Sequence, residues 1–301
     1  MRMRSIFGKW GGLSARGGLP VRFLVLFAIL AVSALAEDSQ ARAKRVIDDA
    51  IAALGGQAFL AMQDRSESGR VYSFYREQLT GLATATIYTR YQPAPDPHAL
   101  AVCERDSFAK SHKDEHEMYA NLFTNDGVWD ISYRGVRPLP KDRLPRYKES
   151  QRHNIFYILR VRLHEPGMIF ESQGADVLDN RPVEIVNITD PDNETTTVYF
   201  DQTTKLPIRQ VFYRRDPVTR DRDEEVTVFA KYRDVGDGVQ WPFDVQRMRN
   251  GEVIFQIYAE TVKVNQGLDD SLGDLLNTWF RSHCITPHRF SLAPRTRKGP
   301  C

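Results

Sequence analysis

KYRDVGDGVQWPF, residues 231–243, is the stretch that best indicates how this chain folds. The overlapping stretch Val226–Tyr232 alternates apolar with polar side chains, as a strand with one buried face does. Gly236-Asp237-Gly238 can turn tightly between two strands, and Trp241-Pro242-Phe243 begins the second strand. The stretch therefore predicts an antiparallel hairpin.

Similar strand signals extend outward from this hairpin in both directions. Two segments instead carry apolar residues at helical spacing: residues 40–54, which end at Gly55-Gly56, and residues 147–163, which end at Glu165-Pro166-Gly167. Because no long helix separates successive strands, we expect an α+β fold that is mainly an antiparallel meander of about ten strands. The expected strands include residues 71–75, 84–89, 119–123, 128–131, 183–188, 196–200, 208–213, 226–232 and 253–259.

The alternation also predicts which side chains face a cavity. A wide curved sheet with two helices to cover it either packs full of side chains or leaves an apolar pocket that suits small apolar ligands. Both outcomes remain open. We expect inward apolar faces on two strands, with the helix of residues 147–163 as a lid. The candidate cavity-facing residues are Val226, Val228, Ala230, Val253, Phe255, Ile257, Ile155 and Leu159.

Three stretches resemble motifs of LolA and LolB, the periplasmic lipoprotein carriers. Residues 231–243 have their aromatic-rich strand, Gly turn, Pro and second strand. YFDQTTKLPIR, residues 199–209, resembles their Asp-x-x-Thr-x-x-Pro hairpin, and VKVNQGLDDSL, residues 262–272, resembles the close of their domain. The resemblance spans most of residues 40–272 and is better to the broad group of exported homologues than to the carriers themselves. It implies a curved, half-open β-barrel covered by a few helices, whose concave apolar face binds acyl chains or another lipid.

The first 36 residues have the pattern of a secretory signal peptide. They hold five basic residues and no acidic one, then the apolar run Phe23–Val32, then the small-x-small sequence Ala34-Leu35-Ala36. The apolar run is shorter than the ~20 residues that a membrane-spanning helix needs. We therefore expect cleavage near Ala36 and a periplasmic or otherwise exported protein. Residues 37–275 are then the half-barrel domain, and residues 276–301 are a basic, disordered tail.

Charge and cysteine content limit the partners. The chain holds 41 basic and 39 acidic residues, but the two basic termini leave an acidic body, which argues against a nucleic-acid partner. Export permits disulfides. Cys103, Cys284 and Cys301 allow at most one internal bridge, and a bridge and three free thiols both remain open.

One motif suggests a different function. His112-Lys113-Asp114-Glu115-His116 matches H-x-x-E-H, in which two histidines bind zinc and the glutamate activates the metal-bound water. Glu194 is the candidate third ligand. That arrangement needs a helix, whereas the flanking residues have the pattern of strands around a charged turn, where residues four apart do not converge.

We therefore expect an exported carrier of a lipid or of lipoprotein acyl chains, without catalytic residues or a cofactor. Its expected partners are a lipid or an acylated lipoprotein and, transiently, a membrane surface, and we expect a monomer. Two alternatives remain: a zinc metallohydrolase that uses His112, Glu115 and His116, and an envelope scaffold with a filled barrel.

Overall fold

The computed structural model describes residues 39–94, 99–109, 117–215 and 220–268. The chain divides into two units, Met1–Ser39 and Gln40–Cys301, and every strand lies in the second. The predicted leader, residues 1–36, and the predicted tail, residues 276–301, lie outside the described residues. Within the described residues, no helix is long and apolar enough to cross a membrane.

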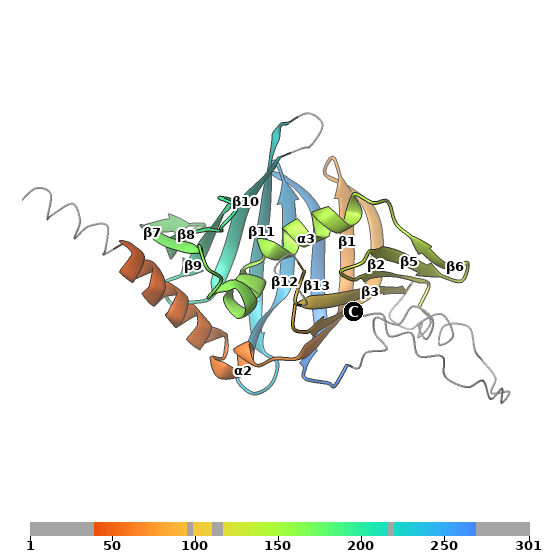
Figure 1. The fold of residues 1–301 in the computed structure, drawn as a ribbon, viewed down its shortest axis with the longest axis horizontal. Coiled ribbons are helices and arrows are strands. Elements are labelled where there is room, and N and C mark those ends of the chain that lie inside the picture. Colours follow the sequence, from red (N-terminus) through yellow and green to blue (C-terminus); the bar gives the residue numbers. More distant parts are fainter. Residues whose placement is uncertain (1–38, 95–98, 110–116, 216–219, 269–301) are drawn as a thin grey trace, which may run out of the picture. The chain divides into compact units, whose positions relative to one another are not determined.

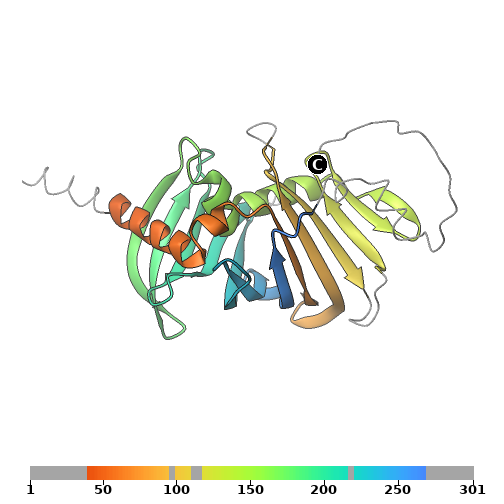
Figure 2. The ribbon, with the colours of Figure 1, turned by 90° about the horizontal axis from the view of Figure 1, so that it is seen from below.

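One antiparallel sheet of 13 strands forms the framework of the second unit (Figure 1). Its strands are neighbours in the order β6-β5-β4-β3-β2-β1-β13-β12-β11-β10-β9-β8-β7, so the sheet is a meander whose edges, β6 and β7, do not meet. Figure 2 shows the strands in an arc, which confirms the curved, half-open barrel that the sequence predicted. The strands are β1 (Asp64–Tyr75), β2 (Gln78–Tyr91), β3 (Val102–Ala109), β4 (Tyr119–Phe123), β5 (Val128–Ser132), β6 (Gly135–Pro138), β7 (Ile169–Leu178), β8 (Arg181–Thr189), β9 (Thr195–Asp201), β10 (Pro207–Arg215), β11 (Arg222–Asp234), β12 (Gln240–Arg249) and β13 (Glu252–Val264).

Pairing between β1 and β13 joins the two ends of the domain. The Asp64 carboxylate strengthens this joint, because its oxygens accept hydrogen bonds from the backbone amides of Gln266, Gly267 and Leu268 at 2.7–3.0 Å. The whole meander is therefore held as one sheet at the point where its first and last strands meet.

Helices cover one face of the sheet, which we call the inner face. Residues 40–54 are helical, as predicted, and bury Ala43, Ile47, Ala50 and Leu54 at helical spacing against it. The other helices are α2 (Gln57–Leu60), α3 (Arg143–Arg152), α4 (Ile155–Tyr157) and the π-helical turn η1 (Ile158–Arg162).

The prediction of one continuous helix over residues 147–163 is wrong, because the structure has three successive helical elements there. The chain leaves the helix at His153 and Asn154, where Asn154 is extended with ψ 122°. The Asn154 side chain accepts hydrogen bonds from the amides of Phe156 and Tyr157, so it is the N-cap of a new helix. This break lets α3 take a different course from α4 and η1.

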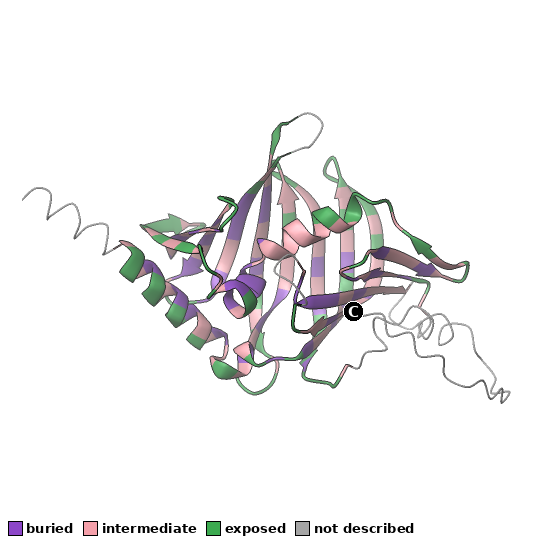
Figure 3. Cartoon of the chain, in the orientation of Figure 1, coloured by how far each residue is buried: buried purple, intermediate pink, exposed green. Residues whose placement is uncertain are grey.

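The main core lies between the inner face and the buried sides of the helices (Figure 3). Phe156 is at its centre, where its ring contacts Phe59, Phe229 and Trp241 at centroid distances of 4.6–6.5 Å. This cluster occupies one part of the inner face, and a separate apolar cluster occupies another part.

Candidate ligand-binding site

The structure divides the predicted cavity-facing residues between the two faces of the sheet. Phe255 and Ile257 lie on the inner face, since they are opposite Arg247 and Val245 of β12, and Val245 packs against the main core. Val226, Val228 and Ala230 lie on the outer face, because they alternate with Phe229, which belongs to that core. The prediction that both strands turn these sets inward is therefore wrong for β11.

A β-bulge places Val253 on the outer face as well. The register of β12 and β13 shifts after Arg247, so Val253 is opposite Met248 while Phe255 is opposite Arg247. Simple alternation along the sequence does not reveal the extra residue of a bulge, and such a residue reverses the face of every side chain beyond it.

Ile155 and Leu159 are inside the main core and are 0% and 1% exposed. They have almost no exposed surface for a ligand to contact, because both side chains pack inside the main core. A contact between a ligand and these two residues stays a prediction.

The inner face carries a second apolar region, which we call the floor. Val71, Ala85 and Ile257 are buried in it, and Ala83, Ile87, Phe108, Val245 and Phe255 are only partly buried around them. These residues come from β1, β2, β3, β12 and β13, so the floor spans the middle of the sheet. The partial exposure of these five residues distinguishes the floor from the buried centre of the main core.

Helix α3 crosses the inner face above the floor. At one side, Arg214 of β10 forms an ion pair with Glu149 at 2.8 Å and donates a hydrogen bond to Ser150 at 2.9 Å. At the other side, the Tyr147 ring stacks on Phe123 of β4 at a centroid distance of 4.4 Å. None of the residues of α3 is fully buried. The helix therefore covers the floor without packing any side chain completely into it.

Carboxylates line the inner face on the β1–β3 side of the floor. Glu67 of β1 lies 3.7 Å from Arg65, and Glu104 and Asp106 follow on the same face of β3. Burial is the main cause that raises the pKa of all three carboxyl groups, and for Asp106 the neighbouring Glu104 raises it further. These groups are therefore recessed in the protein, although Glu104 and Asp106 keep part of their surface open.

Guanidinium groups line the β10–β12 side. Arg214 and Arg249 both contact the buried Glu225 carboxylate, at 3.6 Å and 2.8 Å. Arg247 lies between Arg249 and Val245 along the same face of β12, and burial lowers its pKa. Sequence reasoning missed these residues because charges at alternate strand positions are typical of a solvent-exposed face.

A small polar hollow adjoins the carboxylate side. It has a volume of about 50 Å³, and its lining includes Arg65, Thr89, Glu104, Asn154 and Trp241. A hollow of this size holds water molecules and not a lipid chain. The Arg65 guanidinium lies 4.2 Å from the Trp241 ring and closes the hollow toward the main core.

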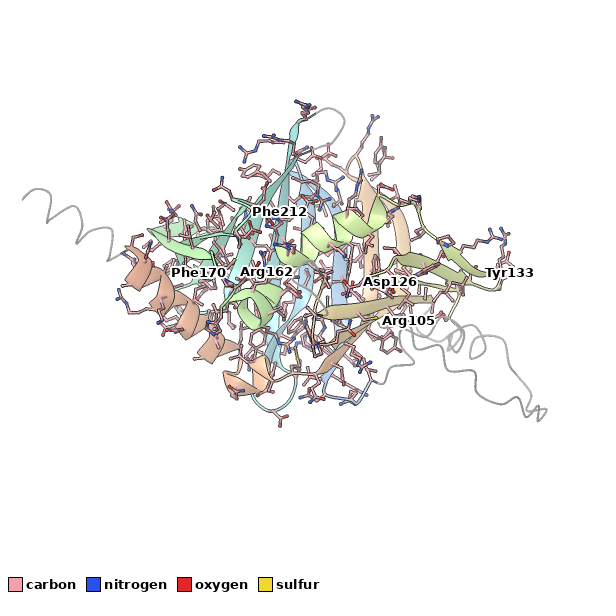
Figure 4. The ribbon with its side chains drawn as sticks, in the orientation of Figure 1. Arg105, Asp126, Tyr133, Arg162, Phe170 and Phe212 are labelled. Atoms are coloured by element: carbon pink, nitrogen blue, oxygen red, sulfur yellow. The ribbon has the colours of Figure 1, made fainter. Side chains whose placement is uncertain are left out.

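A separate apolar groove lies beside the helix of residues 40–54. Its volume is about 440 Å³, within the range of ligand pockets in general. Phe170, at the start of the edge strand β7, lies next to this helix (Figure 4) and lines the groove with Ile47, Leu163 and Met168. Lys44 and His164 supply polar groups.

The structure does not describe His112, Glu115 or His116, which lie outside its described residues. The residues on either side are strands, β3 and β4, which pair with each other. Glu194 is exposed in the turn between β8 and β9. Among the described residues no three His, Cys, Asp or Glu side chains are grouped so as to hold a metal ion.

Cys103 has no exposed surface and is disulfide-bonded. It lies on the outer face of β3, beside Leu122 and Ile131. Cys284 and Cys301 lie outside the described residues. Of the two possibilities that the sequence left open, the structure therefore shows the bridge.

Neither a family model nor a curated protein matches the chain. Solved structures do match. A domain from Vibrio parahaemolyticus that is named for outer-membrane lipoprotein sorting has a TM-score of 0.51 and 10% identity, over 80% of this chain and 99% of its own. A DUF1329-family protein from Desulfovibrio piger has a TM-score of 0.51 and 12% identity, over 76% of this chain and 96% of its own. At these identities the likeness concerns the fold alone: the chain shares its fold with these two structures, which agrees with the fold implied by the resemblance at residues 199–209 and 231–243.

Proposed function

We propose that this protein is an exported, non-enzymatic carrier that holds a lipid, or the acyl chains of a lipoprotein, on the floor of its half-barrel. The observation that supports this most is the floor itself. Five of its apolar side chains are only partly buried, and the helix above them buries none of its own residues. Apolar side chains that stay partly exposed on the inner face offer a lipid chain surface to cover.

The energetics of acyl-chain burial fit a carrier. Each methylene group removed from water contributes ~0.8 kcal/mol, so eight methylene groups supply about 6 kcal/mol before the costs of binding. The floor extends over five strands, and its partly buried residues include two phenylalanines, Phe108 and Phe255. This surface offers a chain contacts along its length.

The first experiment is native mass spectrometry of the mature protein, purified from the cell envelope without detergent and then extracted with solvent. We expect bound lipid or acylated peptide at a defined stoichiometry. A bare protein mass would favour the scaffold with a filled barrel. One zinc ion per chain without lipid would favour the metallohydrolase.

A pair of variants tests the location. Phe255→Asp places a charge on the floor, and Val228→Asp places the same charge on the outer face of a strand two positions away in the sheet. We expect Phe255→Asp to abolish lipid uptake and Val228→Asp to retain it, with folding of both checked by circular dichroism. Equal uptake by the two folded variants would place the site elsewhere, and the apolar groove beside the helix of residues 40–54 would then be the next candidate.

Export is part of the same proposal. N-terminal sequencing of the protein from the periplasmic fraction should begin close to Glu37 if cleavage follows Ala36. An intact N-terminus in the cytoplasmic fraction would contradict it. Size-exclusion chromatography with light scattering tests the expected monomer.

A further inference from the structure

The charged groups beside the floor have opposite net charge on its two sides. On the β1–β3 side, the carboxylates of Glu67, Glu104 and Asp106 outnumber the one guanidinium, Arg65. On the β10–β12 side, three guanidinium groups face two carboxylates. These five groups are Arg214, Arg247, Arg249, Glu149 and Glu225.

Charged groups on the two sides of the floor interact electrostatically but form no ion pair with each other among the described residues. Arg247 is near enough to Glu104 and Asp106 to lower the pKa of both carboxyl groups, against the larger effect of burial. The ion pairs that these groups form among the described residues, however, join Arg65 to Glu67, Arg214 to Glu149 and to Glu225, and Arg249 to Glu225. None of them joins Arg247 to either carboxylate of β3, so these opposite charges remain apart across the inner face.

One carboxylate oxygen on this side, Oδ1 of Asp106, is buried and lacks a hydrogen-bond partner among the described residues. The Tyr147 hydroxyl, on α3, is buried as well, and after burial Glu104 and Asp106 are the largest influences that raise its pKa. An unsatisfied buried polar group costs about 1–3 kcal/mol, and a ligand that donates a hydrogen bond to Asp106 would recover that free energy.

We propose that the carried lipid has a zwitterionic head group, with an ammonium group bound by Glu104 and Asp106 and a phosphate group bound by Arg247. The acyl chain of the same molecule, which is joined to the phosphate, lies on the floor. This inference rests on the proposed function and specifies its ligand. A head group with a single charge would satisfy one side of the floor and leave the other side desolvated and unpaired, which is unfavourable.

The geometry of the donors fits these two groups. Carboxylates only accept hydrogen bonds, and an ammonium group only donates them. A guanidinium presents a planar set of donors that matches phosphate oxygens. Tyr147 can either donate or accept, and it lies on the roof above the ammonium position.

The experiment compares four probes with the same dodecyl chain: dodecylphosphoethanolamine, dodecylamine, dodecyl phosphate and dodecanol. Isothermal titration calorimetry of the delipidated mature protein, below the micelle concentration of each probe, gives the dissociation constants. We expect the zwitterion to bind at least tenfold more tightly than dodecanol and more tightly than either singly charged probe.

Three variants assign the charges. Glu104→Gln and the double variant Glu104→Gln, Asp106→Asn should weaken the zwitterion and dodecylamine at least tenfold and leave dodecanol unchanged. Arg247→Gln should weaken the zwitterion and dodecyl phosphate and leave dodecylamine unchanged. Arg70→Gln, on an exposed ion pair with Glu260, is the matched control and should change none of them.

The outcomes separate the two proposals. If dodecanol binds as tightly as the zwitterion and the variants change nothing, the head-group inference is wrong and the acyl-chain carrier stands. If no probe binds the folded protein, the carrier proposal itself fails. A variant that does not fold is replaced by the single Asp106→Asn change, because Oδ1 of Asp106 has no hydrogen-bond partner among the described residues to lose.

Discussion

Arg162 of η1 and Asp190 of the turn between β8 and β9 form an ion pair of 3.0 Å, and their side chains are only 5% and 6% exposed. The same guanidinium contacts Glu165 at 2.6 Å and donates a hydrogen bond to the backbone oxygen of Arg152. Asp190 Oδ1 in turn accepts hydrogen bonds from the amides of Asp192 and Glu194. This network fastens the helical segment that carries Ile155 and Leu159 to the sheet.

Replacing one partner of this pair should destabilise the fold strongly. Arg162→Met removes the nearer of the two cations of the buried Asp190 carboxylate and leaves Arg152 at 3.7 Å, and a broken buried ion pair typically costs about 3–5 kcal/mol. Urea unfolding measures the free energy. Arg146→Gln is the control, since Arg146 pairs with Asp142 on the exposed side of α3 and should change stability by less than about 0.5 kcal/mol. Equal effects of the two variants would show that the buried network does not fasten the helix.

His153, where the predicted long helix breaks, gives the fold a defined pH dependence. Its Nδ1 lies 2.8 Å from Thr196 Oγ1, and its ring stacks on Phe212. Burial is the main cause that lowers the pKa of His153 from 6.5 to about 4, and Asp190 partly opposes it. As pH falls below 6.5 the unfolded chain therefore binds the proton first, and stability decreases until about pH 4.

His153→Gln isolates this effect because glutamine cannot titrate. The unfolding free energy of the wild type minus that of the variant should be smaller at pH 4.5 than at pH 7.5, by about 2–3 kcal/mol. Using the difference removes the contribution of Glu67, Glu104 and Asp106, whose raised pKa values act in the opposite direction. A difference that is independent of pH would mean that the buried ring is not neutral in the folded protein.

Periodicity in the sequence predicted most of the fold. All nine expected strand segments lie inside strands, because each combines β-branched or aromatic residues with a nearby turn. Strands β3, β6 and β7 were missed or only partly predicted. VCERDSFA of β3 has charges on both alternations, β6 is four residues long, and β7 is a largely exposed edge strand.

The candidate site was harder to predict, for two physical reasons. Phe229 lies on the alternation of β11 that also carries Thr227 and Glu225, so the face with fewer apolar residues is the inner one. The bulge after Arg247 then reverses the face of Val253 relative to Phe255. Phe255 and Ile257 lie on one face, the inner one, because no bulge separates them in β13, and their contact with a ligand stays a prediction.

The disulfide of Cys103 predicts how many free thiols the protein has before and after reduction. The sequence offers only Cys284 and Cys301 as internal partners, so one of the three cysteines should remain free. Titration with a thiol reagent in denaturant should give one thiol per chain without reductant and three after reduction. Cys103→Ser should raise the first value to two. Three thiols in the unreduced wild type would contradict the bridge.

Gly69 tests the joint between the first and last strands. The register of β1 against β13 shifts between Ser68 and Gly69, and a Cβ atom on Gly69 would overlap the backbone oxygen of Tyr258 and crowd the Cα atom of Ala259. Both obstacles are backbone, so they cannot move away as a flexible side chain does.

Gly69→Ala should therefore lower the free energy of unfolding by about 1–3 kcal/mol, the usual cost of an overpacked interior. Gly127→Ala is the matched control, because the added methyl group would meet only the Trp129 ring at 3.4 Å. Denaturation with urea, followed by circular dichroism, gives both values. Because β1 and β13 also carry Val71, Ile257 and Phe255 of the floor, a shift in their pairing should weaken lipid binding by Gly69→Ala as well. A fully stable Gly69→Ala protein would mean that the two strands can separate locally without loss, and the closed joint would not be needed to hold the floor.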